Sequence, residues 1–491
     1  MSLPTASRVD PRNSRVDALA LGAGTRLQLT RLDLAATDTA TAAAFAALVR
    51  RGAVPDARIR DDARVILEEV RVGGAAAIRR ANATYGGGRA NGDLFVDRAE
   101  LAAAANRLSR DVRRALDQAI ASVRRFAETQ RPETTRTAIV PGVEIERRWT
   151  PLSRVGCYVP GGSAPYPSSL VMTVVPARVA SVREVVVASP ADANGRIDPV
   201  LLGAAGILDV DALLVAGGAQ AIGALAFGLA DEGFAPVDRI VGPGNAWVTA
   251  AKIEVNGLIG IDLPAGPSEG MVLADRAADP VLVAADLVTQ AEHGPDSPAI
   301  LVTTDPELAD AVETEIARLL PTLERRAILE RALREHGRIV LAPDLDGAIE
   351  FANAYAPEHL SVDVEDVEAA VARLDSAGSL FVGPWAPESA GDYATGANHV
   401  LPTGGLARSC GPLSVESFGR YSQVQRIDRT GLSALADTIR TLATAEGLSA
   451  HRNAVDARFR TVPADDPGTV TPAPDPAAPP RPAASPTASD R

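Results

Sequence analysis

The sequence predicts an α/β protein in which parallel sheets are covered by helices. From about residue 180 onward, short apolar runs rich in β-branched residues alternate with stretches of helical spacing. This alternation is typical of βα units, which place parallel strands beneath a layer of helices. The chain has 491 residues, about three times the roughly 150 residues of a single domain, so we expect two α/β units.

The region before this alternation has a different pattern. Residues 1–25 have no apolar periodicity, and we expect a loose N-terminus. From about 40 to 130 the sequence is rich in Ala, Arg and Leu, with apolar residues three or four apart, which predicts helices. Between 135 and 180, short β-like runs occur among Pro and Gly.

The apolar runs of the alternating region are predicted to be strands. They are Glu184–Ala188, Ala212–Ala216, Arg239–Val241, Met271–Leu273, Ala299–Val302, Arg338–Leu341 and Ser379–Val382. A last helical segment, about 431–458, lies outside this pattern and is expected to pack on another domain or another chain. Residues 461–491 are rich in Pro and Ala and cannot bury enough apolar area to fold, so we predict a disordered tail.

Charge and composition exclude several classes of protein. The formal net charge of −13 argues against wrapping nucleic acid or binding anionic lipid. No apolar run approaches the roughly 18 residues of a membrane span. Arg8, Arg12 and Arg15 precede no apolar segment, so the start does not have the pattern of a secretory signal. Two cysteines, Cys157 and Cys410, cannot make a disulfide scaffold, so we expect the protein to act in the reducing cytoplasm.

Lysine occurs once, at Lys252, after Ala251. A phosphate-binding P-loop needs Gly-Lys-Ser/Thr, so ordinary P-loop nucleotide hydrolysis is excluded. We interpret Lys252 as a helix-surface cation rather than as a Schiff-base lysine. The chain has five histidines, which limits the candidates for imidazole chemistry to His293, His336, His359, His399 and His451.

The first candidate motif is the segment from Gln290 to Ser297. A helix is predicted from Pro280 and ends at Gly294-Pro295, so Gln290 and His293 share one face. A neutral imidazole is a good zinc ligand, and a carboxamide oxygen is a weaker one. The alternative is a histidine that is only stabilised by the carboxyl end of the helix. The motif by itself leaves both interpretations open.

The second motif is Tyr355-Ala356-Pro357-Glu358-His359-Leu360, just before an apolar stretch. A carboxylate and an imidazole at a loop-to-strand junction suit proton transfer, because histidine titrates near neutrality and burial tunes a glutamate upward. A solvated glutamate beside a half-buried histidine is the alternative, and the pattern does not exclude it.

The third motif is the polar, glycine-rich segment from Pro384 to Gly405, which we expect to form a long loop. A plain linker would lack the large side chains Trp385, Tyr393 and His399. Asp392 offers an anionic metal ligand, whereas His399 is expected to form hydrogen bonds within the loop.

The fourth motif pairs Glu446 with His451, with Gly447 interrupting the helix between them. On spacing alone this signal is weak, and exposed side chains are the default expectation.

Nucleotide-binding signals are incomplete. No clean Gly-x-Gly-x-x-Gly lies between a strand and a helix, but Gly217–Gly223 and Gly242–Asn245 each follow a predicted strand. Small residues there let a pyrophosphate approach a helix N-terminus. Tight βα turns also use glycine for purely structural reasons, so neither loop identifies a dinucleotide by itself.

Together, and in this order, the motifs resemble one family, histidinol dehydrogenase. The matching segments are Arg154–Gly162, Gly242–Asn245, Pro264–Glu269, Gln290–Ser297, Pro357–Leu360, Gly391–Tyr393 and Asn398–Thr403. The resemblance covers roughly residues 30–460. It implies oxidation of L-histidinol to L-histidine through L-histidinal, in two hydride transfers with two NAD and one water, as the final step of histidine biosynthesis.

The resemblance also implies an architecture of two incomplete Rossmann-like domains with parallel-sheet cores. Small helical N- and C-terminal segments are exchanged in a homodimer. On this sequence we expect residues 26–157 with 269–413 to form the first α/β domain, 158–268 the second, and 414–460 a C-terminal helical arm.

Site residues follow from the same resemblance. It implies one zinc per subunit, and the implied ligands are Gln290, His293, Asp392 and His451, the last from the partner chain. The implied catalytic pair is Glu358 and His359. Implied substrate contacts are Ser268, His399 and Glu446, together with His359 and the zinc ligands. Implied NAD contacts are Tyr158, Gln220 and Asn245.

One position departs from the family pattern. Gly270 stands where the family commonly has a bulkier aliphatic residue, and we expect this to affect packing more than chemistry. His336 is left as ordinary helix surface.

Three alternatives remain: a related NAD-dependent dehydrogenase acting on another alcohol, a zinc hydrolase, and a ligand-binding protein without catalysis. The presence of Asp392, Glu446 and His451 favours histidinol as the small-molecule substrate. We expect neither nucleic acid nor a membrane as a partner.

Overall fold

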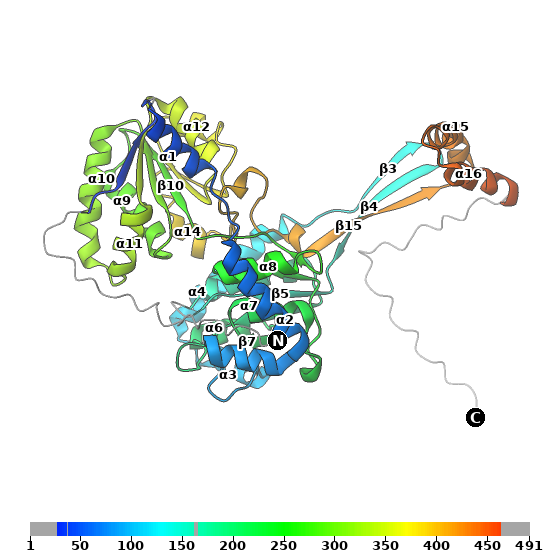
Figure 1. Cartoon of the computed structure of the whole chain (residues 1–491), viewed down its shortest axis with the longest axis horizontal. Helices are drawn as coiled ribbons and strands as arrows, with labels where there is room; N and C mark the ends of the chain where they lie inside the picture. The colour runs from blue at the N-terminus through cyan, green and yellow to red at the C-terminus, as the bar shows by residue number, and fades with distance from the viewer. Residues whose placement is uncertain (1–26, 37, 162–164, 463–491) are drawn as a thin grey trace, which may run out of the picture. The chain divides into compact units, whose positions relative to one another are not determined.

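The computed structural model describes residues 27–36, 38–161 and 165–462 (Figure 1). They form two compact units: the described residues of Met1–Pro132 with Pro151–Arg420, and those of Glu133–Thr150 with Tyr421–Arg491. The predicted loose segment 1–25 and, from residue 463 on, the predicted tail lie outside the described residues. Within the described ranges, no helix combines the length and the apolar character needed to cross a membrane.

The first sheet of the larger unit is entirely parallel. Its spatial order is β1 (Thr30–Asp33), β12 (Arg338–Leu341), β11 (Ala299–Thr303), β10 (Gly270–Ala274), β13 (His359–Asp363) and β14 (Ser379–Val382). Successive side chains of a strand point to opposite faces. Val272 therefore packs in one core with α9 (Pro280–Glu292), α10 (Pro306–Leu319) and α11 (Arg326–His336). Met271 packs in the other, with α12 (Leu345–Tyr355), α13 (Val367–Val371) and the adjoining α1 (Thr39–Val49).

The second sheet has an antiparallel edge strand, β2, on an otherwise parallel core. Its order is β2 (Phe95–Val96), β7 (Ala212–Val215), β6 (Glu184–Ser189), β5 (Arg154–Tyr158), β8 (Arg239–Val241) and β9 (Gly260–Ile261). One apolar core joins it to α2 (Ala57–Tyr85), α7 (Gly218–Phe227) and α8 (Ala246–Val255). The remaining helices here, which pack against one another, are α3 (Arg98–Arg107), α4 (Arg110–Glu128), α5 (Pro167–Val179) and α6 (Pro199–Ile207).

The smaller unit contains a three-stranded sheet and two helices. The sheet order is β15 (Gly419–Ile427), β4 (Val143–Pro151) and β3 (Thr135–Val140), and the helices are α15 (Arg429–Ala445) and α16 (Ser449–Thr461). The buried carboxylate of Glu146 forms ion pairs with Arg136, Arg148 and Arg426, which ties all three strands together. The short α14 (Glu388–Tyr393) and the 3₁₀ turns Ala230–Glu232, Leu320–Thr322, Leu406–Arg408 and Val415–Phe418 complete the described elements.

Every strand predicted from an apolar run is confirmed, with each end within one residue of the expected position. The helices predicted between 40 and 130 and in the last segment are confirmed as well, with Gly447 separating α15 from α16. The fold class is therefore the expected one.

The expected domain boundaries differ from the structure in two places. Helices α2, α3 and α4 and strand β5 belong with the second sheet, although residues 26–157 were assigned to the first domain. Residues 133–150 join the C-terminal segment, which contains strand β15 as well as helices. Periodicity shows that a helix has an apolar face, but it does not show which sheet that face covers.

The single lysine also differs from expectation, since Lys252 lies on α8 with its side chain only 2% exposed. It forms an ion pair with Asp262, whose side chain is equally buried. Lys252 Nζ donates to the carbonyl of Gly242 at 3.0 Å, and Asp262 accepts from the Gly242 N–H at 2.7 Å. The ion pair thus holds both backbone groups of Gly242, whose φ of +113° favours glycine.

We expect Lys252→Met to destabilise the fold, because it leaves the Asp262 carboxylate buried without a cation. The loss of one partner from a buried ion pair typically costs about 3–5 kcal/mol. Chemical denaturation measures this, with the double variant Lys252→Met/Asp262→Asn as the matched control, which should recover part of the loss. A single variant as stable as the wild type would contradict the prediction.

Candidate active site

The candidate residues gather at the amino ends of three neighbouring parallel strands. Ser268 and Glu269 precede β10, and Glu358 precedes β13, which begins at His359. Gln290 lies in the last turn of α9 on the way to β11. Because Gly270 stands opposite His359 in the parallel register, the segments entering β10 and β13 run side by side.

A directional chain of hydrogen bonds joins the predicted catalytic pair. His359 Nδ1 lies 3.1 Å from Gln290 Oε1, Gln290 Nε2 donates to Ser268 Oγ at 3.3 Å, and Ser268 Oγ donates to Glu358 Oε2 at 2.7 Å. A carboxamide oxygen can only accept, so Nδ1 of His359 is assigned the proton. Nε2 of His359 is then the basic nitrogen.

Burial sets the charge states of this pair. It lowers the pKa of His359 well below its ordinary value, and the nearby His293 and His399 lower it further. Burial raises the pKa of Glu358 well above its ordinary value, against the effect of the hydrogen bonds from Ser268 and the Glu269 N–H. The pair therefore combines a neutral imidazole with a carboxyl group of increased basicity.

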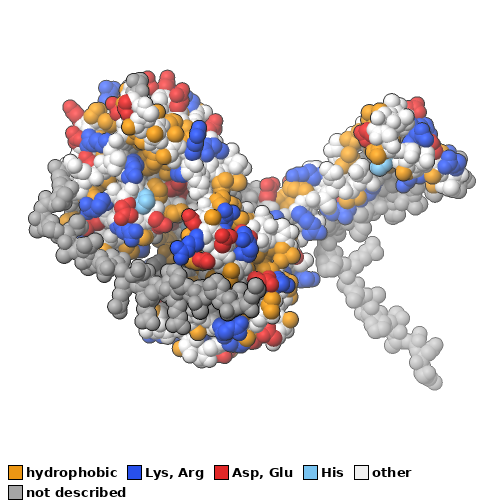
Figure 2. Space-filling model, in the orientation of Figure 1, with side chains coloured by type: hydrophobic (Ala, Val, Ile, Leu, Met, Phe, Trp, Pro, Cys, Tyr) orange, Lys and Arg blue, Asp and Glu red, His pale blue; other side chains and the backbone are white. Residues whose placement is uncertain are grey.

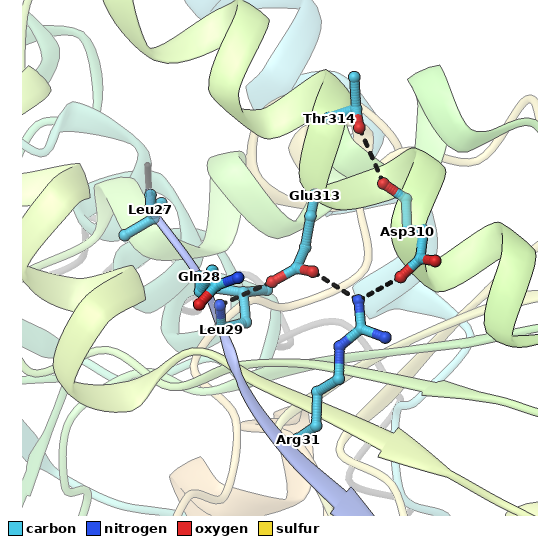
Figure 3. Close-up of a pocket in the computed structure, with 7 residues that line it drawn as sticks. All are labelled: Leu27, Gln28, Leu29, Arg31, Asp310, Glu313 and Thr314. Carbon is cyan, nitrogen blue, oxygen red and sulfur yellow. Dashed lines mark hydrogen bonds and ion pairs between the residues drawn. The ribbon is translucent and has the colours of Figure 1, made fainter. Parts of the chain in front are cut away.

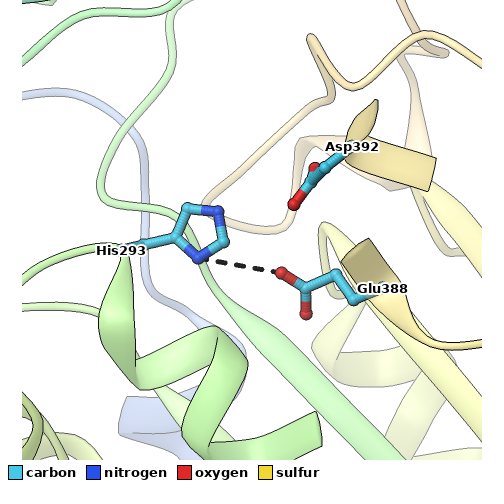
Figure 4. A group of neighbouring side chains, drawn as sticks. All are labelled: His293, Glu388 and Asp392. Atoms are coloured by element: carbon cyan, nitrogen blue, oxygen red, sulfur yellow. Dashed lines mark ion pairs between the residues drawn. The ribbon is translucent and has the colours of Figure 1, made fainter. Parts of the chain in front are cut away.

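A cluster of metal-binding groups lies beside this pair. Figure 4 shows His293, Glu388 and Asp392 pointing toward one another, and their ligand atoms lie within 4.8 Å of each other. Glu388 Oε1 is 3.7 Å from His293 Nδ1 and 3.6 Å from His359 Nδ1. This oxygen is buried and has no hydrogen-bond partner among the described residues. One imidazole and two carboxylates, one of them with an unpartnered oxygen, suit a divalent cation such as zinc.

Sequence reasoning missed Glu388, because the segment from Pro384 to Gly405 was expected to be a loop. The structure corrects this, since Glu388 and Asp392 lie on the short helix α14. Residues four apart share a helix face, so both carboxylates reach the same cluster. The signal available in the sequence was Pro387 followed by Glu388, with a second acidic residue, Asp392, four positions further on.

The four predicted zinc ligands are not all brought together. His293 and Asp392 lie in the cluster, whereas the carboxamide of Gln290 bonds Ser268 and His359. Glu446 and His451 lie in the smaller unit, at the end of α15 and on α16, and both are exposed. Their contact with the site stays a prediction.

His399 forms the expected hydrogen bond within its own segment, from Nδ1 to the carbonyl of Asp392 at 3.1 Å. Its Nε2 also lies 3.3 Å from Ser169 Oγ on α5. The neighbouring Asn398 donates to the carbonyl of Met172 at 2.7 Å. This segment therefore links α14 to the helix that covers the second sheet.

The predicted NAD contacts lie at the carboxyl ends of strands in the second sheet. Tyr158 ends β5, its hydroxyl accepts the Gly218 N–H at 3.2 Å, and burial raises its pKa to about 12. Gln220 is buried in the first turn of α7, and Asn245 is the N-cap of α8. Carboxyl ends of strands and N-termini of helices are where open α/β sheets bind phosphate groups.

The glycine that departs from the family pattern contacts the site. A Cβ added to Gly270 would lie 2.5 Å from Gln290 Oε1. The packing effect expected here therefore reaches the carboxamide that bonds His359, and a larger residue would have to displace it.

A separate pocket of about 630 Å³ lies between β1 and α10 (Figure 3). Arg31 forms ion pairs there with Asp310 and Glu313, and none of the predicted site residues lines it. On the face drawn in Figure 2, basic and acidic side chains are interspersed.

The chain is similar to known proteins over most of its length. The family model for histidinol dehydrogenase matches residues 49–459. The chain belongs to the histidinol dehydrogenase family. A histidinol dehydrogenase of Leifsonia xyli is 46% identical over 422 residues, covering 85% of this chain and 97% of that protein. One from Halobacterium salinarum is 47% identical over 414 residues, covering 84% and 96%.

The crystal structure of histidinol dehydrogenase from Elizabethkingia anophelis matches with a TM-score of 0.81 at 33% identity. The matched region covers 88% of this chain and 98% of the chain in that crystal structure. The α/β fold with parallel-sheet cores is thus the histidinol dehydrogenase fold, and the chain is an oxidoreductase of that family.

We expect His293→Asn to lower metal content together with activity, because it removes the only imidazole of the described cluster. Metal analysis of the purified protein after zinc loading measures the content, and His336→Asn on the helix surface is the matched control. Full zinc occupancy with unchanged kinetics in His293→Asn would remove this residue from the ligand set.

Proposed function

We propose that this chain oxidises L-histidinol to L-histidine through L-histidinal, in two successive hydride transfers to NAD, as the final step of histidine biosynthesis. The observation that carries the proposal is the pairing of neutral His359 with buried Glu358 beside the cluster of His293, Glu388 and Asp392. The proposal is supported by the relatives from Leifsonia xyli and Halobacterium salinarum, which match over nearly their full length and are both called histidinol dehydrogenase.

Zinc and NAD are the proposed cofactors. The proposed zinc ligands, one set per subunit, are Gln290, His293, Asp392 and the partner's His451, with Glu388 in reach of the same cation. The proposed NAD contacts are Tyr158, Gln220 and Asn245. When bound, zinc supplies a Lewis acid that holds the amine and imidazole nitrogens of histidinol, and NAD supplies the hydride acceptor.

His359 carries the first proton transfer in this proposal. Its neutral Nε2 accepts the hydroxyl proton of histidinol as the carbon loses hydride, and the alcohol becomes an aldehyde. Gln290 fixes the tautomer by accepting from Nδ1. The low pKa given by burial keeps the imidazole unprotonated before each turnover.

Glu358 carries the next step. It takes a proton from water as the hydroxide adds to the aldehyde carbon, and protonated His359 returns its proton to the carbonyl oxygen, which gives the gem-diol. His359, now neutral again, then takes a diol proton as the second hydride leaves. Burial increases the basicity of Glu358, as this role requires. Ser268 and the Glu269 N–H hold Oε2, so Oε1 is the oxygen left to face water.

The charge around the site suits a cationic substrate. The carboxyl end of α9 adds partial negative charge to the carboxylates of Glu388 and Asp392. The partner's Glu446 would add a further carboxylate for the imidazole N–H. We propose a homodimer with exchanged C-terminal arms that acts in the cytoplasm.

The decisive experiment is a spectrophotometric assay with L-histidinol and NAD, with and without a chelator. We expect two NADH per histidinol, with loss of activity on metal removal and recovery with zinc. A zinc hydrolase would give no NADH, and a dehydrogenase for another alcohol would leave histidinol unoxidised. Either result would overturn the proposal.

We expect Glu358→Gln to slow overall turnover by about 100- to 10,000-fold, the usual contribution of a general base. Oxidation of added L-histidinal should suffer most, because the variant cannot activate water. Stopped-flow measurement of each half-reaction separates the steps, and the exposed Glu368→Gln is the matched control. Normal histidinal oxidation by Glu358→Gln would make the assignment wrong.

A mixing experiment tests whether His451 comes from the partner. His293→Asn and His451→Asn should each be inactive alone, yet a mixed dimer would contain one intact site. Random mixing would then restore about one quarter of wild-type activity, since half of the dimers are mixed and each has one of its two sites. No recovery on co-expression, with mixed dimers demonstrated, would contradict arm exchange.

A further inference from the structure

Arg51 connects the two segments that carry the proposed chemistry, although no motif singles it out. It follows α1 and is half-buried. Its guanidinium forms a two-pronged ion pair with Glu269, in which Nε donates to Oε2 at 2.6 Å and Nη2 to Oε1. Nη1 donates to the carbonyl of Tyr355 at 2.6 Å, and the Cζ atom lies 3.2 Å from the centroid of the Tyr355 ring.

Glu269 transmits this anchorage to both proposed catalytic residues. Its N–H donates to Glu358 Oε2 at 3.0 Å, and its carbonyl accepts from the His359 N–H at 3.2 Å. Its carboxylate also accepts from the Gly404 N–H at 3.0 Å and from the Tyr355 hydroxyl at 3.3 Å. The buried Glu269 side chain is therefore fully committed to holding neighbouring segments.

The second segment held by Arg51 contains a backbone conformation that needs support. Ala356 has φ +53°, in the left-handed region that alanine rarely adopts. It stands two residues before Glu358, and Arg51 Nη2 lies 3.4 Å from its carbonyl. Contacts on the carbonyls of Tyr355 and Ala356 thus restrain the turn that delivers Glu358 and His359 to β13.

We infer that Arg51 is a positioning residue for the reaction, which holds the Ser268-Glu269 segment against the Tyr355–His359 segment and so fixes Glu358 and His359 in place relative to Ser268 and Glu269. This inference rests on the proposed roles of those two residues. Arginine suits the task because its planar fork binds a carboxylate with two parallel bonds while its face stacks on an aromatic ring. A lysine ammonium is a single point charge and cannot make all of these contacts.

The test compares Arg51→Met and Arg51→Lys with the exposed neighbour Arg50→Met as the matched control. We expect kcat to fall about 100-fold in Arg51→Met, the effect of misplacing reacting groups by about 1 Å. KM for NAD should change by less than about twofold, because Arg51 contacts none of the proposed NAD residues. Arg51→Lys should recover only a small part of kcat, and Arg50→Met should match the wild type.

A role confined to stability predicts a different result. Arg51→Met would then denature at lower urea while its kcat per folded, zinc-loaded chain stayed at the wild-type value, and this would overturn the inference. If Arg51→Met does not fold, Arg51→Lys decides: a kcat equal to the wild type would also overturn it.

Crystal structures of the wild type and of Arg51→Lys separate this inference from the proposed function. If the wild type fails to oxidise histidinol, the proposed function is wrong, but displacement of Glu358 and His359 in the variant still supports positioning by Arg51. Unchanged positions of both side chains in the variant would contradict it, whatever the substrate.

Discussion

The candidate active site depends on the register between the parallel strands β10 and β13. Gly270 stands opposite His359, so the residues that enter the two strands lie side by side and form one backbone hydrogen bond and one bond from backbone to side chain. The carbonyl of Glu269 accepts from the His359 N–H, and the Glu269 N–H donates to Glu358. A slip of one residue would turn His359 to the opposite face of the sheet and break both links.

The candidate sites of the larger unit lie at opposite ends of the strands in its two sheets. The ends of the neighbouring helices explain why. In the first sheet the site lies at the amino ends of the strands, where α9 and α12 end. The partial negative charge of helix carboxyl ends suits a cation and a cationic substrate. In the second sheet Tyr158, Gln220 and Asn245 lie where strands end and α7 and α8 begin, and the partial positive charge there suits phosphate groups. One α/β architecture thus offers sites of opposite sign.

Much of this could be predicted from the sequence, because local pattern determines local structure. Apolar runs such as Arg338–Leu341 predict strands, and the adjacent Glu358 and His359 point to the candidate site. Other features depend on contacts between distant residues. Arg51 acts across more than two hundred positions on Glu269, so no local pattern identifies it. Lys252 is buried because Asp262 compensates its charge, and α2 covers the second sheet because its apolar face fits there. The helix that carries Glu388 is short and lies within a glycine-rich stretch, so its sequence shows too few turns for a helical period to be recognised.

The burial of Lys252 has a consequence for the chemistry of the molecular surface. Positive side chains on the outside of this protein are guanidinium groups and imidazoles, since the chain has no other lysine. Amine-acylating reagents therefore find no accessible ε-amino group on the folded chain. Acylation at residue 252 becomes possible only when α8 separates from Asp262, so the rate of that labelling measures how often this part of the protein opens.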